Sequence, residues 1–524
     1  MKSNTVLKGV EKTKKPMNKA AFVFGDQLKL NNEIFEDDKN IPIILIESIN
    51  ECTKIINNKN RIVFFISSMR NFRDLLISNG YKVKYFKLGF FKSNVSLVES
   101  IFHVLKELKI TELKLQKPGD FELYKSLVDN AKKNKINLMV STSIYDYLPP
   151  EFFYNWSNNK KKLLMEFFYR KVRVEKNILI DNSSKPIGGK WNYDFLNREG
   201  YKKSQKLKVP FFHKSKKTKN TLDVIKEVDE IFSNSPGNTE KFFYATNIDD
   251  AKESLEAFIN SKLENFGKFQ DLMLEDQAFM FHAIISPYLN ANILSPEYVI
   301  NRILQVYEEK KIPINSIEGF IRQIIGWREF MKGVYWKKMP DLISNNFFEI
   351  NNKLPEFYWN ANTKMSCLKT VITQVLEYGY AHHIQRLMIL GNFALLSETN
   401  PKEVHYWFLG MFIDAVEWVE MPNVIGMSQF SEGGFFTSKP YISSGQYINK
   451  MSNYCQKCKY KIKTDDIDEL CPFTILYWRF LNNHKSKLIT NPRMTMAYRN
   501  LERNNKIKGY IKKGSEILSN INHL

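Results

Sequence analysis

The first part of the chain alternates short apolar runs with amphipathic stretches. Strands that alternate with helical patterns are typical of a parallel sheet whose strands are joined by crossover helices. We predict five buried strands, at Ala20–Leu28, Ile41–Ser48, Arg61–Met69, Tyr81–Leu88 and Ile136–Ser141. Ligands of such sheets bind beyond the carboxyl ends of the strands, where Asp26, Gln27, Glu47 and Ser67 are expected.

The pattern changes after Leu148–Trp156. From 151 to 244 the chain is polar and carries basic runs such as His213–Asn220, which predicts an interdomain linker. After residue 245 the apolar positions follow a helical period. A chain of 524 residues exceeds what one core supports. We therefore predict a disordered basic tail over 1–19, an α/β domain over 20–150, a linker over 151–244 and an all-α domain over 245–524.

Charge and cysteine content restrict the class of protein. Lys and Arg exceed Asp and Glu by 77 − 56 = 21. This surplus favours a polyanionic partner, nucleic acid first, although a lysine-rich proteome would give the same excess. Five cysteines in this length fit a reducing, cytosolic setting better than a disulfide framework. No run of eighteen apolar residues indicates a membrane span, and no GxGxxG or Walker motif indicates nucleotide hydrolysis.

Three of the five cysteines lie within a single short segment. Cys455, Cys458 and Cys471 have the spacing C-x2-C-x12-C, which directs thiolates towards one centre. A fourth ligand must come from Cys52 or Cys367, and we choose Cys367 because Cys52 belongs to the α/β half. Four thiolates suit zinc and an iron–sulfur cluster equally well. The alternative is a set of unrelated structural cysteines.

Two adjacent histidines interrupt the apolar segment Tyr378–Met388. His382 and Arg386 are four residues apart and would share a helix face, whereas His383 would face another neighbour. Imidazoles titrate near neutrality, so one of them is a candidate general acid. The alternative is a pair of core histidines with satisfied hydrogen bonds.

Other charged residues lie in apolar runs of the helical half. Arg328, Asp414, Glu417 and Glu420 require charged partners or a polar ligand there. Several tryptophans accompany them, namely Trp327, Trp336, Trp359, Trp407 and Trp418.

These motifs have a familiar order. Ile285–Glu297, Trp327–Phe330, His382–Met388 and Phe412–Asn423 resemble the flavin-binding half of the photolyase/cryptochrome family. The four cysteines and the FGDQL sequence at Phe24–Leu28 narrow this resemblance. Together they resemble the iron–sulfur bacterial cryptochromes and photolyases, a branch that includes (6-4) photolyases, from about residue 20 to the end of the chain.

The resemblance implies a fold and a set of cofactors. The α/β domain would be an antenna domain that holds 6,7-dimethyl-8-ribityllumazine near Asp26, Glu47 and Glu51. The all-α domain would bind FAD and would end in an iron–sulfur segment, with a [4Fe-4S] cluster on Cys367, Cys455, Cys458 and Cys471. The residues expected to approach the FAD phosphates and ribityl chain are Phe266, Gly267, Gln270, Asp271 and Ser286. Those expected around the flavin are Gln323, Arg328, Arg386, Asp414 and, near its reactive nitrogen, Asn423.

The resemblance also implies light-driven repair of UV-damaged DNA by a monomeric, cytoplasmic, nucleoid-associated DNA photolyase. Reduced FAD would donate an electron to a flipped-out (6-4) photoproduct, with His383 as general acid beside His382. Tyr441 and Glu420 would help to position the lesion. Trp407 and Trp359 match an electron relay, although Phe408 replaces a tyrosine that occurs in some relatives. The alternatives are a cryptochrome-like photoreceptor with the same cofactors and a zinc-stapled DNA-binding protein without enzymatic activity.

Overall fold

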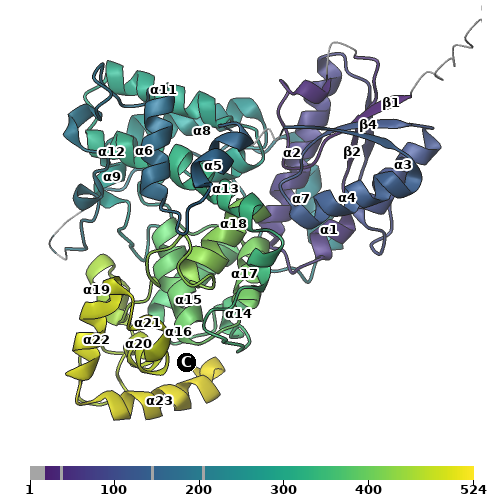
Figure 1. The fold of residues 1–524 in the computed structure, drawn as a ribbon. Coiled ribbons are helices and arrows are strands. Elements are labelled where there is room, and N and C mark those ends of the chain that lie inside the picture. Colours follow the sequence, from purple (N-terminus) through teal and green to yellow (C-terminus); the bar gives the residue numbers. More distant parts are fainter. Residues whose placement is uncertain (1–17, 36–38, 143–146, 203, 205–206) are drawn as a thin grey trace, which may run out of the picture.

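The structure is a computed structural model that describes residues 18–35, 39–142, 147–202, 204 and 207–524. An α/β domain packs beside a larger helical domain, and the C-terminal helices lie at the far end of the latter (Figure 1). The predicted disordered tail lies outside the described residues except for Asn18 and Lys19. Lys19 belongs to the first strand.

Five parallel strands form the sheet, in the order β3-β2-β1-β4-β5. They are β1 (Lys19–Phe22), β2 (Ile43–Ile46), β3 (Val83–Phe86), β4 (Glu112–Gln116) and β5 (Asn137–Ser141). Alternate residues of the central strands enter different cores: Ala21 and Ile43 face one side, whereas Phe22 and Ile44 face the other. Both faces are covered, which explains the continuous apolar runs in the sequence.

One predicted strand is a helix. Arg61–Met69 lies within α2 (Lys59–Ser78), which begins at the N-cap Asn58. One side of this helix packs on the sheet, and another side packs against the later helix over 219–231. Its apolar residues therefore point in several directions and show no helical period. Ser67 is therefore buried in a helix and does not lie at a strand end. The other helices of the domain are α1 (Ile49–Thr53), α3 (Leu97–Glu107) and α4 (Phe121–Asn134).

The strand β4 was missing from the sequence prediction. It reads ELKLQ, and all five residues are buried although three are polar. Glu112 lies 3.4 Å from the ammonium group of Lys19, and Asn137 donates to its other oxygen. These cross-strand partners make burial of the polar residues tolerable, and they come from other strands.

The range 151–244, predicted to be a linker, contains helices. These are α5 (Pro150–Ser157), α6 (Met165–Glu175) and α7 (Lys219–Ile231). Helix α7 packs against α2 of the α/β domain, and α6 packs against the helical domain. The segment is thus docked on both domains, and the domain boundaries themselves stay a prediction.

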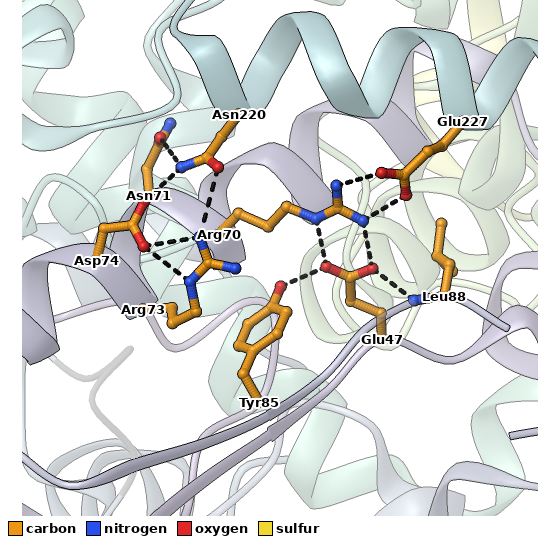
Figure 2. Close-up of polar contacts among 9 residues, drawn as sticks. All are labelled: Glu47, Arg70, Asn71, Arg73, Asp74, Tyr85, Leu88, Asn220 and Glu227. Atoms are coloured by element: carbon orange, nitrogen blue, oxygen red, sulfur yellow. Dashed lines mark hydrogen bonds and ion pairs between the residues drawn. The ribbon is translucent and has the colours of Figure 1, made fainter. Parts of the chain in front are cut away.

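A buried arginine fastens α7 to the sheet (Figure 2). Arg70 of α2 is 1% exposed and makes paired hydrogen bonds to Glu47 (2.7 and 2.8 Å) and to Glu227 of α7 (2.7 and 2.5 Å). Burial alone would lower the pKa of Arg70, but its hydrogen bonds with Glu47 and Glu227 raise it. Removing one partner of such a buried pair destabilises proteins by about 3–5 kcal/mol.

The remaining helices build the second domain. They are α8 (Ile248–Ser261), α9 (Leu263–Phe269), α10 (Ser286–Asn290), α11 (Pro296–Glu309), α12 (Ile314–Ile321), α13 (Glu329–Lys338), α14 (Phe357–Asn360), α15 (Ser366–Tyr378), α16 (Asn392–Leu396), α17 (Pro401–Met411), α18 (Glu417–Met421), α19 (Gly445–Met451), α20 (Pro472–Asn483), α21 (Lys485–Leu488), α22 (Thr495–Glu502) and α23 (Ile507–Ser519). The predicted parallel sheet followed by a large helical domain is confirmed.

Three π-helical turns interrupt these helices. They are η4 (Arg322–Arg328), η6 (Gln385–Gly391) and η7 (Pro422–Ser428). π-Helical turns are rare in proteins overall. Those that occur often lie at functional sites, because the wider turn redirects side chains. Candidate cofactor residues lie in all three: Gln323 and Arg328 in η4, Arg386 in η6 and Asn423 in η7.

Candidate active site

An arginine–carboxylate pair forms the centre of the site. Arg386 binds Asp414 with both guanidinium ends, at 2.9 and 3.0 Å, and its Nε donates to the carbonyl of Ala381. Ser286, at the start of α10, donates to the same Asp414 at 2.6 Å. Asp414 is 6% exposed, so the carboxylate of the Arg386–Asp414 ion pair is largely shielded from water, and the two hydrogen bonds fix the orientation of the pair. Three predicted site residues are thus brought together, with Ser286 bound to Asp414.

The two histidines lie at a break between helices. Gly379, with φ of +63°, ends α15, and His382 precedes the next helical residues. We expected His382 to lie within a helix together with Arg386. That prediction is wrong, because Gly379, in the left-handed conformation, ends α15 before His382. His382 is 1% exposed and stacks on His282, with ring centroids 4.6 Å apart. Burial lowers the pKa of His382 and lowers that of His282 to about 3, so both imidazoles are neutral.

His383 differs from its neighbour in exposure. Its side chain is open to solvent, yet the surrounding protein lowers its pKa to about 4, with Arg386 adding to the effect. Arg386 contributes because its guanidinium disfavours a second positive charge beside it. His383 stands at the rim of the site and not in its core.

A buried amide pair connects the histidine turn to the cysteine segment. Gln385 accepts a hydrogen bond from the backbone of His382 (3.0 Å) and exchanges two with Gln374 (3.1 and 3.0 Å). It also donates to the hydroxyl of Tyr454 at 3.0 Å. Tyr454 directly precedes Cys455, so the histidine turn and the cysteine segment are held by one hydrogen-bonded unit.

Glu420 lies deep in the protein. Its carboxylate is 2.5 Å from Nδ1 of His405, and burial raises the pKa of Glu420, partly offset by His405. Arg386 acts on the same carboxylate electrostatically. Asn423 bonds to the backbone of its own helix, at Val419 (2.7 Å). Arg328 lies over the ring of Trp418, 4.7 Å from its centroid, and donates to the Leu289 carbonyl.

Tyr441 has different neighbours. Burial raises its pKa, whereas Arg493 and Arg198 act in the opposite direction. Arg198 also acts on Asp271, where burial raises the pKa to about 6. We name Tyr441, Arg198, Asp271 and the nearby Tyr447 the mouth. Glu420 and Tyr441 are predicted to act together, but they have different neighbours: Glu420 pairs with His405, whereas Tyr441 is influenced by Arg493 and Arg198.

The residues of α9 lie between these groups. Phe266 meets the ring of His282 edge-on at 5.8 Å, and the carbonyl of Gln270 lies 3.1 Å from that imidazole. Gly267 allows close helix packing, because a Cβ atom there would lie 2.8 Å from the Asn315 amide. Gln323 is exposed and bonds to its own helix at Gly319.

Trp407 is fully buried, and Phe412 lies between it and Arg386. Its indole donates to the carbonyl of Tyr358 at 3.1 Å, and its ring meets Phe412 at 5.8 Å. Phe412 in turn lies 4.1 Å from the Arg386 guanidinium. Trp359, half-buried, follows Tyr358 in the chain. The rings of Phe412, Trp407 and Tyr358 thus form a continuous aromatic path that starts beside Arg386.

The four predicted cysteine ligands line one cavity. Cys367, Cys455, Cys458 and Cys471 surround an empty volume of about 310 Å³, part of it open to solvent, with apolar side chains between them. Burial raises the pKa of Cys367, and the three other thiols raise it further. Gly445 closes one side, since a Cβ atom there would lie 2.7 Å from Cys471 Sγ. Among the described residues, no three His, Cys, Asp or Glu side chains are placed for a single metal ion.

The predicted antenna residues do not form a single cluster of polar contacts. Both oxygens of Glu47 are used, because Tyr85 and the Leu88 amide donate to them in addition to Arg70. Glu51 pairs with Lys54 at 3.3 Å. The backbone of Asp26 accepts from Asn292 of the helical domain. Glu47 is therefore part of the α7 attachment, and its role in an antenna site stays a prediction.

Sequence reasoning missed several residues. Arg61 of α2 donates to the Ala415 carbonyl at 3.2 Å and lies near Asp414 and Asp26, between the two domains. Two further histidines were also missed. His282 stacks on His382, and His405 pairs with Glu420. Histidine is scarce here, eight in 524 residues, and this scarcity was the available signal. The sequence carries no signal for Arg61, because its segment is predicted to be a strand.

Residues 21–244 match the profile of a family described as deoxyribodipyrimidine photo-lyase-related protein. A (6-4) photolyase of Agrobacterium fabrum is 39% identical over 485 residues, covering 92% of this chain and 95% of that protein. The chain belongs to the photolyase/cryptochrome family. The resemblance inferred from the motifs is thereby confirmed.

Solved structures show the same photolyase-like fold. A bacterial class III photolyase from Agrobacterium tumefaciens superposes with a TM-score of 0.53 at 14% identity, covering 95% of this chain and all of that chain. A cryptochrome from Synechocystis gives a TM-score of 0.51 at 13% identity over 79% of this chain and 83% of that chain. In the part that the structure describes, no helix is long and apolar enough to span a membrane.

Proposed function

We propose that this protein is a light-driven DNA repair enzyme that acts on (6-4) pyrimidine photoproducts. The observation that carries the proposal is the 39% identity to a (6-4) photolyase over nearly the whole chain. The adjacent histidines at the rim of the site support it. The excess of 21 positive charges supports a DNA substrate, since phosphate contacts dominate such affinity.

FAD is the cofactor that the family implies, and the residues present fit a polar ligand. Both ring nitrogens of His382, Nε of Arg61 and Oε1 of Glu420 are buried without a hydrogen-bond partner among the described residues. Such groups are costly unless a ligand or water satisfies them. Arg386, Asp414 and Ser286 would fix the orientation of the flavin. When reduced and excited by light, FAD would supply the electron for repair.

His383 is the proposed general acid. Its pKa of about 4 makes it neutral at pH 7 in the free protein, so it must gain a proton on substrate binding. Anionic phosphates near the rim would raise that pKa by favouring the charged form. We therefore expect the repair rate at saturating DNA to rise as the pH falls from 8 to 6. A flat profile, identical in His383→Ala, would exclude this role.

We infer that the cysteine cavity holds a [4Fe-4S] cluster. Its four thiols line one space, and four thiolates suit such a cluster as well as zinc, so the family resemblance decides the choice. All four sulfur atoms would bind iron as thiolates. The cluster would hold the segment from Cys455 to Cys471 against α15. The lumazine antenna remains part of the proposal, at the carboxyl ends of the strands near Asp26 and Glu51.

The test is light-driven repair of two oligonucleotides by anaerobic, flavin-reduced protein, one with a (6-4) lesion and one with a cyclobutane dimer. Repair of the (6-4) strand alone supports the proposal, and His383→Ala should then lose repair by about 100-fold or more while flavin stays bound. Repair of the dimer alone would correct the lesion class. If coloured, photoreducible protein repairs neither strand, the cryptochrome-like photoreceptor replaces this proposal.

A further inference from the structure

The C-terminal helix α22 has one face that the fold does not use. Met494, Tyr498 and Leu501 are buried towards α20, so the opposite face is presented to solvent. That face carries Met496, Arg499, Asn500 and Arg503, which are all exposed. Their spacing of three, four and seven residues places them on one side of the helix. Arg493, in the 3-10 turn η9 (Pro492–Met494) just before α22, is also exposed.

We name Arg493, Arg499 and Arg503, together with Met496, the arginine ridge. Within the described part of the chain, no carboxylate lies within ion-pair distance of its three guanidinium groups. The one acid of α22, Glu502, pairs with Lys485 of α21 at 3.1 Å. The ridge thus keeps three uncompensated positive charges.

The next helix shows the opposite pattern. Lys506, just before α23, pairs with Asp465 at 2.8 Å, and Lys513 of α23 pairs with Asp468. Two basic residues at and before α23 thus have acidic partners in the loop that contains Asp465 and Asp468, whereas the three arginines of the ridge have none among the described residues.

The ridge adjoins the mouth. Arg493 acts electrostatically on Tyr441, and Asn491, two residues before it, donates to the Ser438 carbonyl at 3.1 Å. Helix α22 lies on the same side of the molecule as α19, which carries Tyr447 (Figure 1). The ridge and helix α19 therefore lie at the same end of the helical domain (Figure 1).

We infer that the arginine ridge binds the phosphodiester backbone of the DNA duplex that flanks the flipped-out lesion. Three reasons favour this partner. Guanidinium groups match phosphate with two hydrogen bonds each. Ten residues of helical backbone span about 15 Å, or about four base-pair steps at 3.4 Å each. Met496, 64% exposed between the arginines, is a flexible apolar side chain suited to contact the sugars of the same strand.

This inference rests on the proposed function, and the experiment separates the two. The variant Arg493→Gln/Arg499→Gln/Arg503→Gln removes three exposed charges, so the fold and flavin content should persist. A matched control, Lys106→Gln/Lys132→Gln/Lys133→Gln, removes three exposed charges from the α/β domain. Dissociation constants for undamaged and (6-4)-containing duplexes are measured in the dark from 50 to 300 mM salt.

Phosphate contacts predict a clear result. The slope of log K against log salt should become shallower by about 2.7 for the ridge variant, since each contact contributes about 0.9. Affinity at 0.1 M salt should fall on the order of 100-fold for both duplexes, while the control keeps the wild-type slope. Met496→Ala should weaken binding several-fold and leave the slope unchanged.

Two outcomes overturn the inference. One is a ridge variant with the wild-type slope and affinity. The other is an equal loss in the control, because general charge would then explain binding. Either result, combined with intact repair by the wild-type protein, would refute the ridge and leave the proposed function standing. Wild-type protein that repairs nothing and binds both duplexes alike would instead refute the proposed function.

Discussion

Replacing Gln385 by methionine removes the amide that joins the histidine turn to the cysteine segment. Gln385 is fully buried, and its side chain makes four hydrogen bonds, to the His382 backbone, to Gln374 twice and to Tyr454. Methionine has a similar length and no polar group that can replace them. The substitution therefore tests the hydrogen bonds rather than the packing.

The magnitude follows from the groups left behind. The His382 N–H, the Gln374 side-chain oxygen and the Tyr454 hydroxyl would be buried without partners. Each such group costs about 1–3 kcal/mol, and the buried thioether returns about 1 kcal/mol. We expect Gln385→Met to lower the free energy of unfolding by about 3–5 kcal/mol. Tyr454→Phe, which leaves only one amide hydrogen unpaired, should lower it by about 1–2 kcal/mol.

The assay is guanidinium-induced unfolding of the holoprotein, followed by flavin fluorescence and far-UV circular dichroism. Gln305→Met on the exposed face of α11 is the control and should change stability by less than about 0.5 kcal/mol. The double variant Gln385→Met/Tyr454→Phe should lose less than the sum of the single losses, by about 1 kcal/mol, because both remove the same bond.

A loss below about 1 kcal/mol for Gln385→Met would refute the reasoning, because the three groups would then have found other partners. Strict additivity in the double variant would refute the Gln385–Tyr454 bond specifically. A large loss accompanied by normal repair would show that the amide pair stabilises the fold without positioning the histidines.

Three further changes test other parts of the structure. Cys471→Ser should abolish iron and sulfide binding, whereas Cys52→Ser, outside the cavity, should retain both by metal analysis. Burial and the neighbouring Asp120 raise the pKa of Glu417 to about 10 from its ordinary 4.5. The folded protein thus keeps a proton that the unfolded chain releases above pH 4.5, and stability falls as the pH rises towards 10. Glu417→Gln lacks this loss, so its Tm advantage over wild type should grow from pH 5 to pH 9; a constant difference would contradict the shift. Trp407→Phe should slow flavin photoreduction by external donors at least about 10-fold if the aromatic path carries the electron; an unchanged rate would exclude it.

Much of the architecture could be predicted from local patterns. Four of the five predicted strand segments contain a strand, since residues buried on both sheet faces give continuous apolar runs. The same signal misassigned Arg61–Met69, because a helix buried on all sides is also apolar throughout. It missed β4, whose polar residues Glu112 and Gln116 find their partners far away in the sequence. The segment 151–244 was predicted to be a linker because its helices are separated by polar, basic runs such as His213–Asn220.

The candidate site was also only partly predictable from the sequence. The spacing of Cys455, Cys458 and Cys471, together with the choice of Cys367, anticipated the four-cysteine cavity. The motif order anticipated the grouping of Arg386, Asp414 and Ser286, although not the bond between the last two. The roles of these residues towards cofactors stay predictions.

The sequence alone determined the order of a parallel α/β part and a helical part, and which thiols could converge. These properties depend on neighbours within a few residues, and the chain carries them directly. Only the tertiary structure decided that Arg70 joins Glu47 to Glu227, that His282 stacks on His382, and that Gln385 meets Tyr454. Such contacts join residues 23 to 157 positions apart, and they depend on how helices and π-turns pack against each other. No local period encodes that packing, so the site's hydrogen bonds could be read only from the folded chain.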